Sequence, residues 1–240
     1  MKRFFLIALG VFLLPLQIIT ASDSKSAKTN SPAVFLPEQA RALAKQAEAS
    51  FASGDLTQAE SLYKKALEFG PNNAPLLVSL AAIETRMGRL DESERLLQQA
   101  LHLDLKNSPA WLLLGMNYLE EKKNDQAFAA LVQAALYDNR NPRIHNYLGI
   151  AAGRKGWNEP SEDELRKAIE LDPQYADANF NLAVLYLRRT PPLIELGRRH
   201  YQQALDLGLP KDPVIEAQLA KTASDPASST GLPRISRSAL

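Results

Sequence analysis

Apolar residues recur three and four positions apart from about residue 37 to residue 210, and glycine or Pro/Asn groups fall between the apolar runs. This spacing gathers apolar side chains on one face of a helix. No stretch of the sequence alternates apolar and polar residues over a useful length, so helices without a sheet are predicted. Tight turns are predicted at Gly54-Asp55, Gly88-Arg89, Gly156-Trp157, Pro71-Asn72-Asn73 and Pro173-Gln174.

Small and apolar residues return at a fixed step of 34 residues. Three series show the step: Ala66, Ala100, Ala134 and Ala168, with Ala204 36 residues later; Leu80, Leu114, Leu148 and Leu182; and Ala81, Gly115, Gly149 and Ala183. A period of this length indicates one supersecondary unit stacked several times. Such arrays usually present an extended surface for a partner rather than a pocket for catalysis.

The repeat resembles the tetratricopeptide family, whose unit is a helix–turn–helix of 34 residues. The third unit fits the family pattern best, with Trp111, Leu114, Gly115, Tyr118, Ala127, Leu131 and Ala134 at the characteristic positions. The resemblance covers about residues 40 to 210. It implies an all-α, right-handed superhelical solenoid of about five repeats plus a C-terminal capping helix.

Small residues are expected where two helices approach closely, because one helix must make room for the bulk of the other. Ala134→Leu should therefore destabilise the fold by overpacking. The sequence departs from the repeat at two places. Pro160 should sit in the first turn of a shifted helix. The two extra residues around Thr190-Pro191-Pro192 should lengthen a surface loop, and a loop that contacts a partner is the alternative.

The N-terminus has the order of a secretory signal peptide. Lys2 and Arg3 precede an apolar run from Phe4 to Ile19, and small residues follow. The run is short for a membrane span of about 20 residues, so cleavage is expected and an uncleaved anchor is the alternative. The expected location is therefore exported, either periplasmic or secreted.

The sequence thus divides into four parts. They are a signal peptide (1–21), a flexible linker (22–36), a tetratricopeptide repeat domain (37–222) and a disordered tail (223–240). The repeats are expected at about 40–73, 74–107, 108–141, 142–175 and 176–210. A capping helix is expected over 212–222, with Asp212 as its N-cap.

Composition excludes several classes of partner and of functional site. The formal net charge is +1 and there is no cysteine. A near-neutral chain has no global field to hold nucleic acid or an anionic membrane, so membrane contact is expected only through an uncleaved leader. The absence of cysteine excludes disulfides, thiolate metal sites and a thiol nucleophile.

No catalytic constellation stands out. His102, His145 and His200 are far apart, and the sequence has no HExxH or GxSxG motif. His145 falls at a core position of its repeat and is expected to pack there. We therefore expect no enzyme activity, no catalytic residue, no metal and no cofactor.

In tetratricopeptide arrays, ligands usually touch one face of the first helices. The resemblance maps this face, here called the first-helix stripe, onto twelve residues: Val78, Ala82, Arg86, Leu112, Met116, Leu119, Asn146, Ile150, Arg154, Phe180, Val184 and Arg188. The stripe is largely apolar, with Arg86, Arg154 and Arg188 at one edge. It would suit a helix or extended peptide that carries apolar anchors and a carboxylate near the arginines.

The leading hypothesis is a non-enzymatic, exported scaffold that binds a protein or peptide on this stripe. Bacterial proteins resembling it often serve envelope assembly, secretion or pilus biogenesis. The alternative is a structural protein that self-associates, with the apolar stripe as an interface between copies. The linker residues Val34, Phe35 and Leu36 are a further candidate to cover the stripe.

Overall fold

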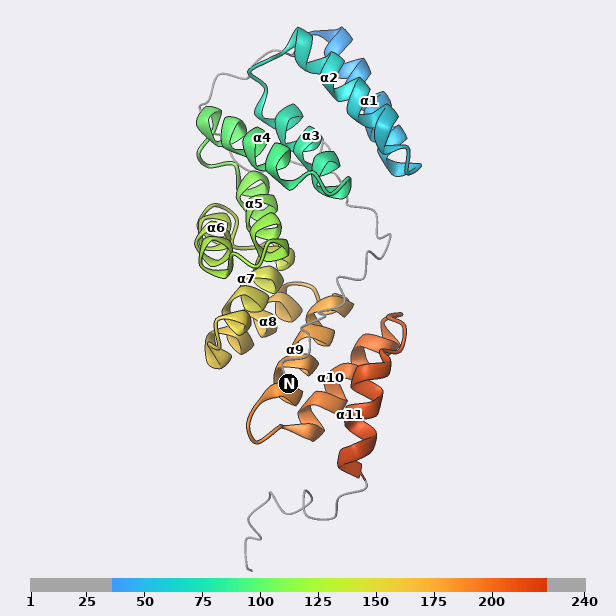
Figure 1. Ribbon diagram of the computed structural model, residues 1–240, viewed down its shortest axis with the longest axis vertical. Helices are drawn as coiled ribbons and strands as arrows, with labels where there is room; N and C mark the ends of the chain where they lie inside the picture. The colour runs from blue at the N-terminus through green and yellow to red at the C-terminus, as the bar shows by residue number, and fades with distance from the viewer. Residues whose placement is uncertain (1–35, 224–240) are drawn as a thin grey trace, which may run out of the picture. The chain divides into compact units, whose positions relative to one another are not determined.

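The computed structural model describes residues 36–223, and these form eleven α-helices without a strand among them (Figure 1). The predicted leader, the linker up to residue 35 and the tail from residue 224 lie outside the described residues. The helices are α1 Glu38–Ala52, α2 Leu56–Phe69, α3 Ala74–Arg86, α4 Leu90–Leu103, α5 Ser108–Glu120, α6 Asn124–Tyr137, α7 Pro142–Arg154, α8 Asn158–Leu171, α9 Ala176–Arg188, α10 Ile194–Asp206 and α11 Pro213–Ala223. None of these helices combines the length and the apolar character needed to cross a membrane.

The described residues form two compact units that divide between Ala110 and Trp111, within α5. In the first unit, α1 packs on α2, and α3 packs on α4. Contacts between α2 and α3 join these two pairs. In the second unit, α7 packs on α8 and α9 on α10, while α6–α7 and α8–α9 contacts join successive pairs. Each predicted repeat is therefore a helix pair, and the prediction of an all-α fold is confirmed.

The turn inside each of the first four repeats has the same geometry. Gly54, Gly88 and Gly156 have φ of 86°, 76° and 79°, the left-handed region that glycine adopts most easily. In each case the N–H that follows bonds back to a carbonyl five residues earlier, for example Asp55 N to Ser50 O at 2.9 Å. The third repeat makes the same turn with Lys122, at φ 62°.

The small positions lie where first and second helices touch, as predicted. Ala66, Ala100, Ala134, Ala168 and Ala204 are all fully buried. A Cβ added at Gly115 would lie 2.5 Å from Cγ of Leu131, and one at Gly149 would lie 2.7 Å from Cγ of Leu165. These distances leave no room for a side chain, which explains why glycine is tolerated inside α5 and α7.

The two departures from the repeat are accommodated. Helix α8 begins at Asn158, so Pro160 lies in its first turn. The neighbouring Ser161 is buried and donates a hydrogen bond to Gly149 O at 2.7 Å. The two extra residues fall in the segment 189–193 between α9 and α10.

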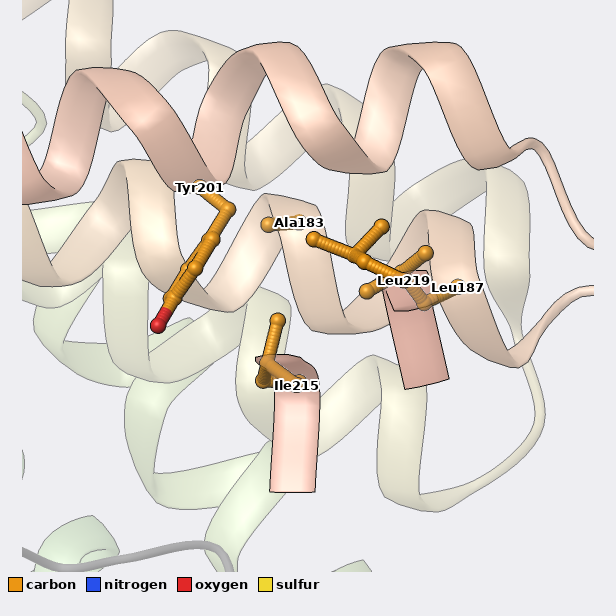
Figure 2. Packing of buried hydrophobic residues seen from close by; sticks show 5 residues of the cluster. All are labelled: Ala183, Leu187, Tyr201, Ile215 and Leu219. Atoms are coloured by element: carbon orange, nitrogen blue, oxygen red, sulfur yellow. The ribbon is translucent and has the colours of Figure 1, made fainter. Parts of the chain in front are cut away.

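Helix α11 caps the second unit. Asp212 Oδ1 accepts hydrogen bonds from the N–H groups of Val214 and Ile215 at 2.8 and 3.0 Å, which confirms the predicted N-cap. Figure 2 shows Ile215 and Leu219 of α11 packed in one buried cluster with Ala183, Leu187 and Tyr201. The cap thereby removes the apolar edge of the last repeat from water.

Candidate partner-binding site

In the first unit, the first-helix stripe is represented by Val78, Ala82 and Arg86 on α3, and all three are half-buried. The guanidinium of Arg86 lies over the ring of Phe51, 4.9 Å from the ring centroid. Such a cation–π contact contributes about 0.5–1 kcal/mol at an exposed site. Arg86 therefore has an aromatic partner on α1 while part of its side chain stays exposed. Leu36, from the linker, lies near Gly70 in the same unit.

On α5, the stripe is mostly core. Leu112 is 7% exposed and Leu119 is 4% exposed, so neither offers much area to a partner. Met116, between them, is half-buried. A methionine at such a position has a flexible, polarisable side chain that adapts to different ligands.

On α7 and α9, Asn146 of the stripe is linked to a second amide, Asn181, which is not one of the twelve stripe residues. Asn181 Nδ2 donates to Asn146 Oδ1 at 2.9 Å, and Asn146 Nδ2 donates to the Tyr175 hydroxyl at 3.4 Å. Asn146 is only 2% exposed, and these bonds satisfy it inside the unit. Asn181 is half-buried, and among the described residues no hydrogen bond reaches its Oδ1. Asn181 thus keeps hydrogen-bonding capacity beyond its bond to Asn146.

Arg154 is less available than the sequence suggested. Its Nη1 donates to the backbone carbonyl of Leu119, at the C-terminal end of α5. Cationic side chains commonly satisfy the last carbonyls of a helix in this way. Burial lowers the pKa of the guanidinium, and its Nε has no hydrogen-bond partner in the described part of the chain. Arg154 therefore links α7 to α5 as well as lining the edge of the stripe.

On α9, the capping helix takes up part of the stripe. Phe180 and Val184 are half-buried because they pack against the cluster that Ile215 and Leu219 complete. Gln218 on α11 donates to the Leu187 carbonyl at 2.8 Å. Arg188, by contrast, is exposed.

The structure adds three residues that sequence reasoning missed. Arg143 and Asp177 lie in the first turns of α7 and α9, and both interact electrostatically with Tyr147. Burial raises the pKa of the Asp177 carboxyl, an effect that the charge of Arg143 opposes. An acid in a first turn is typical of any helix start, so no sequence signal marked this cluster.

Two of the three histidines, His145 and His200, act as packing residues. His145 is buried, with Nδ1 2.6 Å from Glu164 Oε2 and Nε2 3.0 Å from the Asn139 carbonyl oxygen, which confirms the predicted core position. His200 Nδ1 lies 3.1 Å from Asn179 Oδ1, and burial lowers its pKa. His102 is exposed. Within residues 36–223, no group of His, Asp and Glu side chains could hold a metal ion.

Comparison with known families agrees with this geometry. Three sequence models, each described as a tetratricopeptide repeat, match residues 50–116, 108–141 and 164–206. The chain belongs to the tetratricopeptide repeat family. Tetratricopeptide repeats are interaction modules, so this protein is a protein–protein interaction scaffold.

Solved structures of tetratricopeptide proteins share the fold. PilF of Pseudomonas aeruginosa aligns with a TM-score of 0.66 at 18% identity, over 77% of this chain and 88% of that one. MamA of Desulfovibrio magneticus RS-1 gives 0.61 at 17% identity, over 72% and 96%. YrrB, described as a tetratricopeptide protein with an unusual peptide-binding site, gives 0.57 at 19% identity, over 75% and 90%. No curated protein matches the chain by sequence.

Proposed function

We propose that the chain is an exported, non-enzymatic adaptor that binds a peptide or helix of a partner protein on the first-helix stripe of its second unit. The observation that carries the proposal is a set of partly exposed groups, two on this stripe and one beside it. Met116 and Ile150 occupy equivalent positions on α5 and α7, and the Asn181 amide lies on α9 with hydrogen-bonding capacity to spare.

This arrangement fits a peptide better than a small molecule. Met116 and Ile150 supply apolar contact area, and Asn181 can accept from or donate to a peptide backbone. The exposed Arg188 adds a charge at the edge of the stripe, which favours an acidic group on the ligand. The described peptide-binding site of the similar structure YrrB supports the same class of ligand.

A displayed peptide library tests the proposal. Peptides selected on the purified chain should bind Ile150→Lys at least about tenfold more weakly, because the change places a charge in the apolar contact. Leu103→Lys, on the exposed face of α4, is the matched control and should leave affinity unchanged. Peptides that bind the wild type and Ile150→Lys equally would refute the stripe as the binding site.

Export is the part of the proposal that rests on the N-terminal sequence. The charged, apolar and small-residue order of residues 1–22 favours a cleaved leader. A role in envelope assembly, secretion or pilus biogenesis would follow from such a location. Cell fractionation with N-terminal sequencing should find a processed chain outside the cytoplasm, and an unprocessed cytoplasmic chain would refute export.

A further inference from the structure

The capping helix α11 lies on one end of the first-helix stripe. On α9, the stripe residues Phe180 and Val184 pack against the buried cluster that Ile215 and Leu219 of α11 help to form (Figure 2). Ile215 and Leu219 are four residues apart, so they share one face of α11. A segment of the chain itself therefore shows which ligand this end of the stripe accepts, namely a helix with two aliphatic side chains one turn apart.

Helix α11 is held through fewer buried side chains than the first helices of the repeats. Helices α3, α7 and α9 each bury seven residues. From Pro213 to Ala220, the part of α11 whose side chains the structure describes, Ile215 and Leu219 alone are buried. At 11 residues, α11 is also too short to be a stable helix in isolation. Helix α11 can therefore leave its place with fewer lost apolar contacts than α3, α7 or α9 could.

A hydrogen bond of α11 to α9 is one that another helix could make. Gln218 Nε2 donates to the Leu187 carbonyl at 2.8 Å, and Leu187 lies in the last turn of α9. The last carbonyls of a helix lack partners within that helix, so they accept from a donor that reaches them. A partner helix with a side-chain donor directly before its second aliphatic residue offers the same bond.

The surface beneath α11 is apolar. Ala183, Leu187 and Tyr201 are each at most 2% exposed with α11 in place. The ring of Phe180 lies beside that of Tyr201, with ring centroids 6.3 Å apart. Uncovering such a surface to water is unfavourable. Helix α11 is therefore expected to leave only when another apolar helix face replaces it, which makes the process an exchange.

We propose that α11 is a displaceable internal ligand, and that a partner helix with two aliphatic residues four apart takes its place on α9. Helix-in-groove recognition reads residues at this spacing. The exchange adds Phe180 and Val184 to the partly exposed Met116 and Ile150 as contacts for the partner. It also lowers partner affinity in the free chain, because only chains that release α11 bind fully. This inference rests on the proposed function, and it names the partner as a helix and α11 as its regulator.

A synthetic peptide with the sequence of residues 210–222 tests the exchange. In the full chain, Ile215→Glu with Leu219→Glu should release α11, since the two changes place charges in a buried apolar cluster. The labelled peptide should then bind this variant at least about tenfold more tightly than the wild type, in which α11 competes as an attached ligand. The matched control is the same peptide with both residues changed to glutamate, which should bind neither chain.

Two results of this experiment would overturn the exchange. The first is equal binding of the peptide to the wild type and to the double-glutamate chain. The second is a double-glutamate chain that has lost the helical circular dichroism of the repeats, because α11 would then be an inseparable part of the fold.

A lock on α11 tests the link to partner binding, and the absence of native cysteine makes it clean. Arg188→Cys with Gln218→Cys places one thiol at the end of α9 and one on the side of α11 that reaches Leu187, so a bismaleimide can join them. Peptides selected on the wild type should bind the locked chain at least about tenfold more weakly than the same chain with both thiols capped by N-ethylmaleimide.

The outcomes separate this inference from the proposed function. Selected peptides that bind the locked and capped chains equally, yet bind Ile150→Lys weakly, would overturn the exchange and leave the stripe as the binding site. If no peptide could be selected, while the 210–222 peptide bound the double-glutamate chain tightly, the proposed function would be refuted and the exchange of α11 supported.

Discussion

The third and fourth repeats share one buried pattern and differ in what they show to solvent. Both bury an alanine at the equivalent position, Ala134 and Ala168. On the outer face, however, the third repeat carries Phe128, Val132 and Leu136, whereas the fourth carries Glu162, Arg166 and Glu170. Packing between the two helices of a repeat therefore requires the same small inner residue in both. The outer positions differ because each meets a different residue of the following repeat: Phe128 meets Trp157, and Glu162 pairs with Arg189.

The largest expected loss of stability comes from overpacking the buried alanine that the two repeats share. Ala134→Leu and Ala168→Leu should each destabilise the fold by at least about 1–3 kcal/mol, because both sites are fully buried against a neighbouring helix. Denaturant titration measures the free energy of unfolding. A loss at one site but not at the other would show that the two repeats do not share a packing pattern.

The next largest loss of stability is expected from a substitution on the outer face of the fourth repeat. Glu162 accepts from the Tyr186 hydroxyl at 2.9 Å and pairs with Arg166 and Arg189. Glu162→Ala should cost about 1–2 kcal/mol, since it strips partners from partly buried groups. Glu170→Ala, on the same exposed row, should cost less than about 0.5 kcal/mol. If both variants lowered the melting temperature equally, the hydrogen bond and ion pairs of Glu162 would contribute no more to stability than an exposed carboxylate does.

A smaller change in stability is expected at the turn inside each repeat, where the third repeat has lysine and the fourth has glycine. Lys122 adopts the left-handed conformation that Gly156 adopts one repeat later. Lys122→Gly should stabilise the fold by about 0.5–1 kcal/mol by relieving this strain, and Gly156→Lys should destabilise it by a similar amount. If Lys122→Gly lowered the melting temperature, the strain assigned to this turn would be refuted.

The smallest expected effect is a dependence of stability on pH, which arises from a histidine in the fifth repeat. Burial lowers the pKa of His200 below its ordinary 6.5, with Arg199 and Arg166 acting in the same direction and Glu162 opposing. The unfolded chain therefore binds more protons than the folded chain just below pH 6.5, and stability falls as the pH drops through this range. His200→Gln should flatten the dependence of melting temperature on pH between about 7.5 and 5. If the melting temperature of His200→Gln fell with pH as steeply as that of the wild type, other groups would cause the pH dependence.

Much of the fold could be predicted because its determinants recur every 34 residues. The buried alanines, the glycine turns and the Asp212 cap follow from local chemistry that a sequence states directly. The turn at Lys122 could not be predicted, because a lysine gives no signal for a left-handed residue. The sequence likewise gave no sign that Leu119 is core or that its carbonyl binds Arg154, since both depend on contacts between repeats.

The candidate site was predicted less completely than the fold. The 34-residue spacing placed Met116 on α5 and Ile150 on α7 at equivalent positions, and both are partly exposed there. Spacing alone could not show that α11 packs on Phe180 and Val184, because the position of a capping helix depends on tertiary packing. Binding by these twelve residues stays a prediction.

Photo-crosslinking in the native cell from Met116 tests most directly the claim that the first-helix stripe of the second unit binds a partner protein. We predict that Met116 captures a discrete foreign protein. Adducts from Met116 that contain only the chain itself would contradict it.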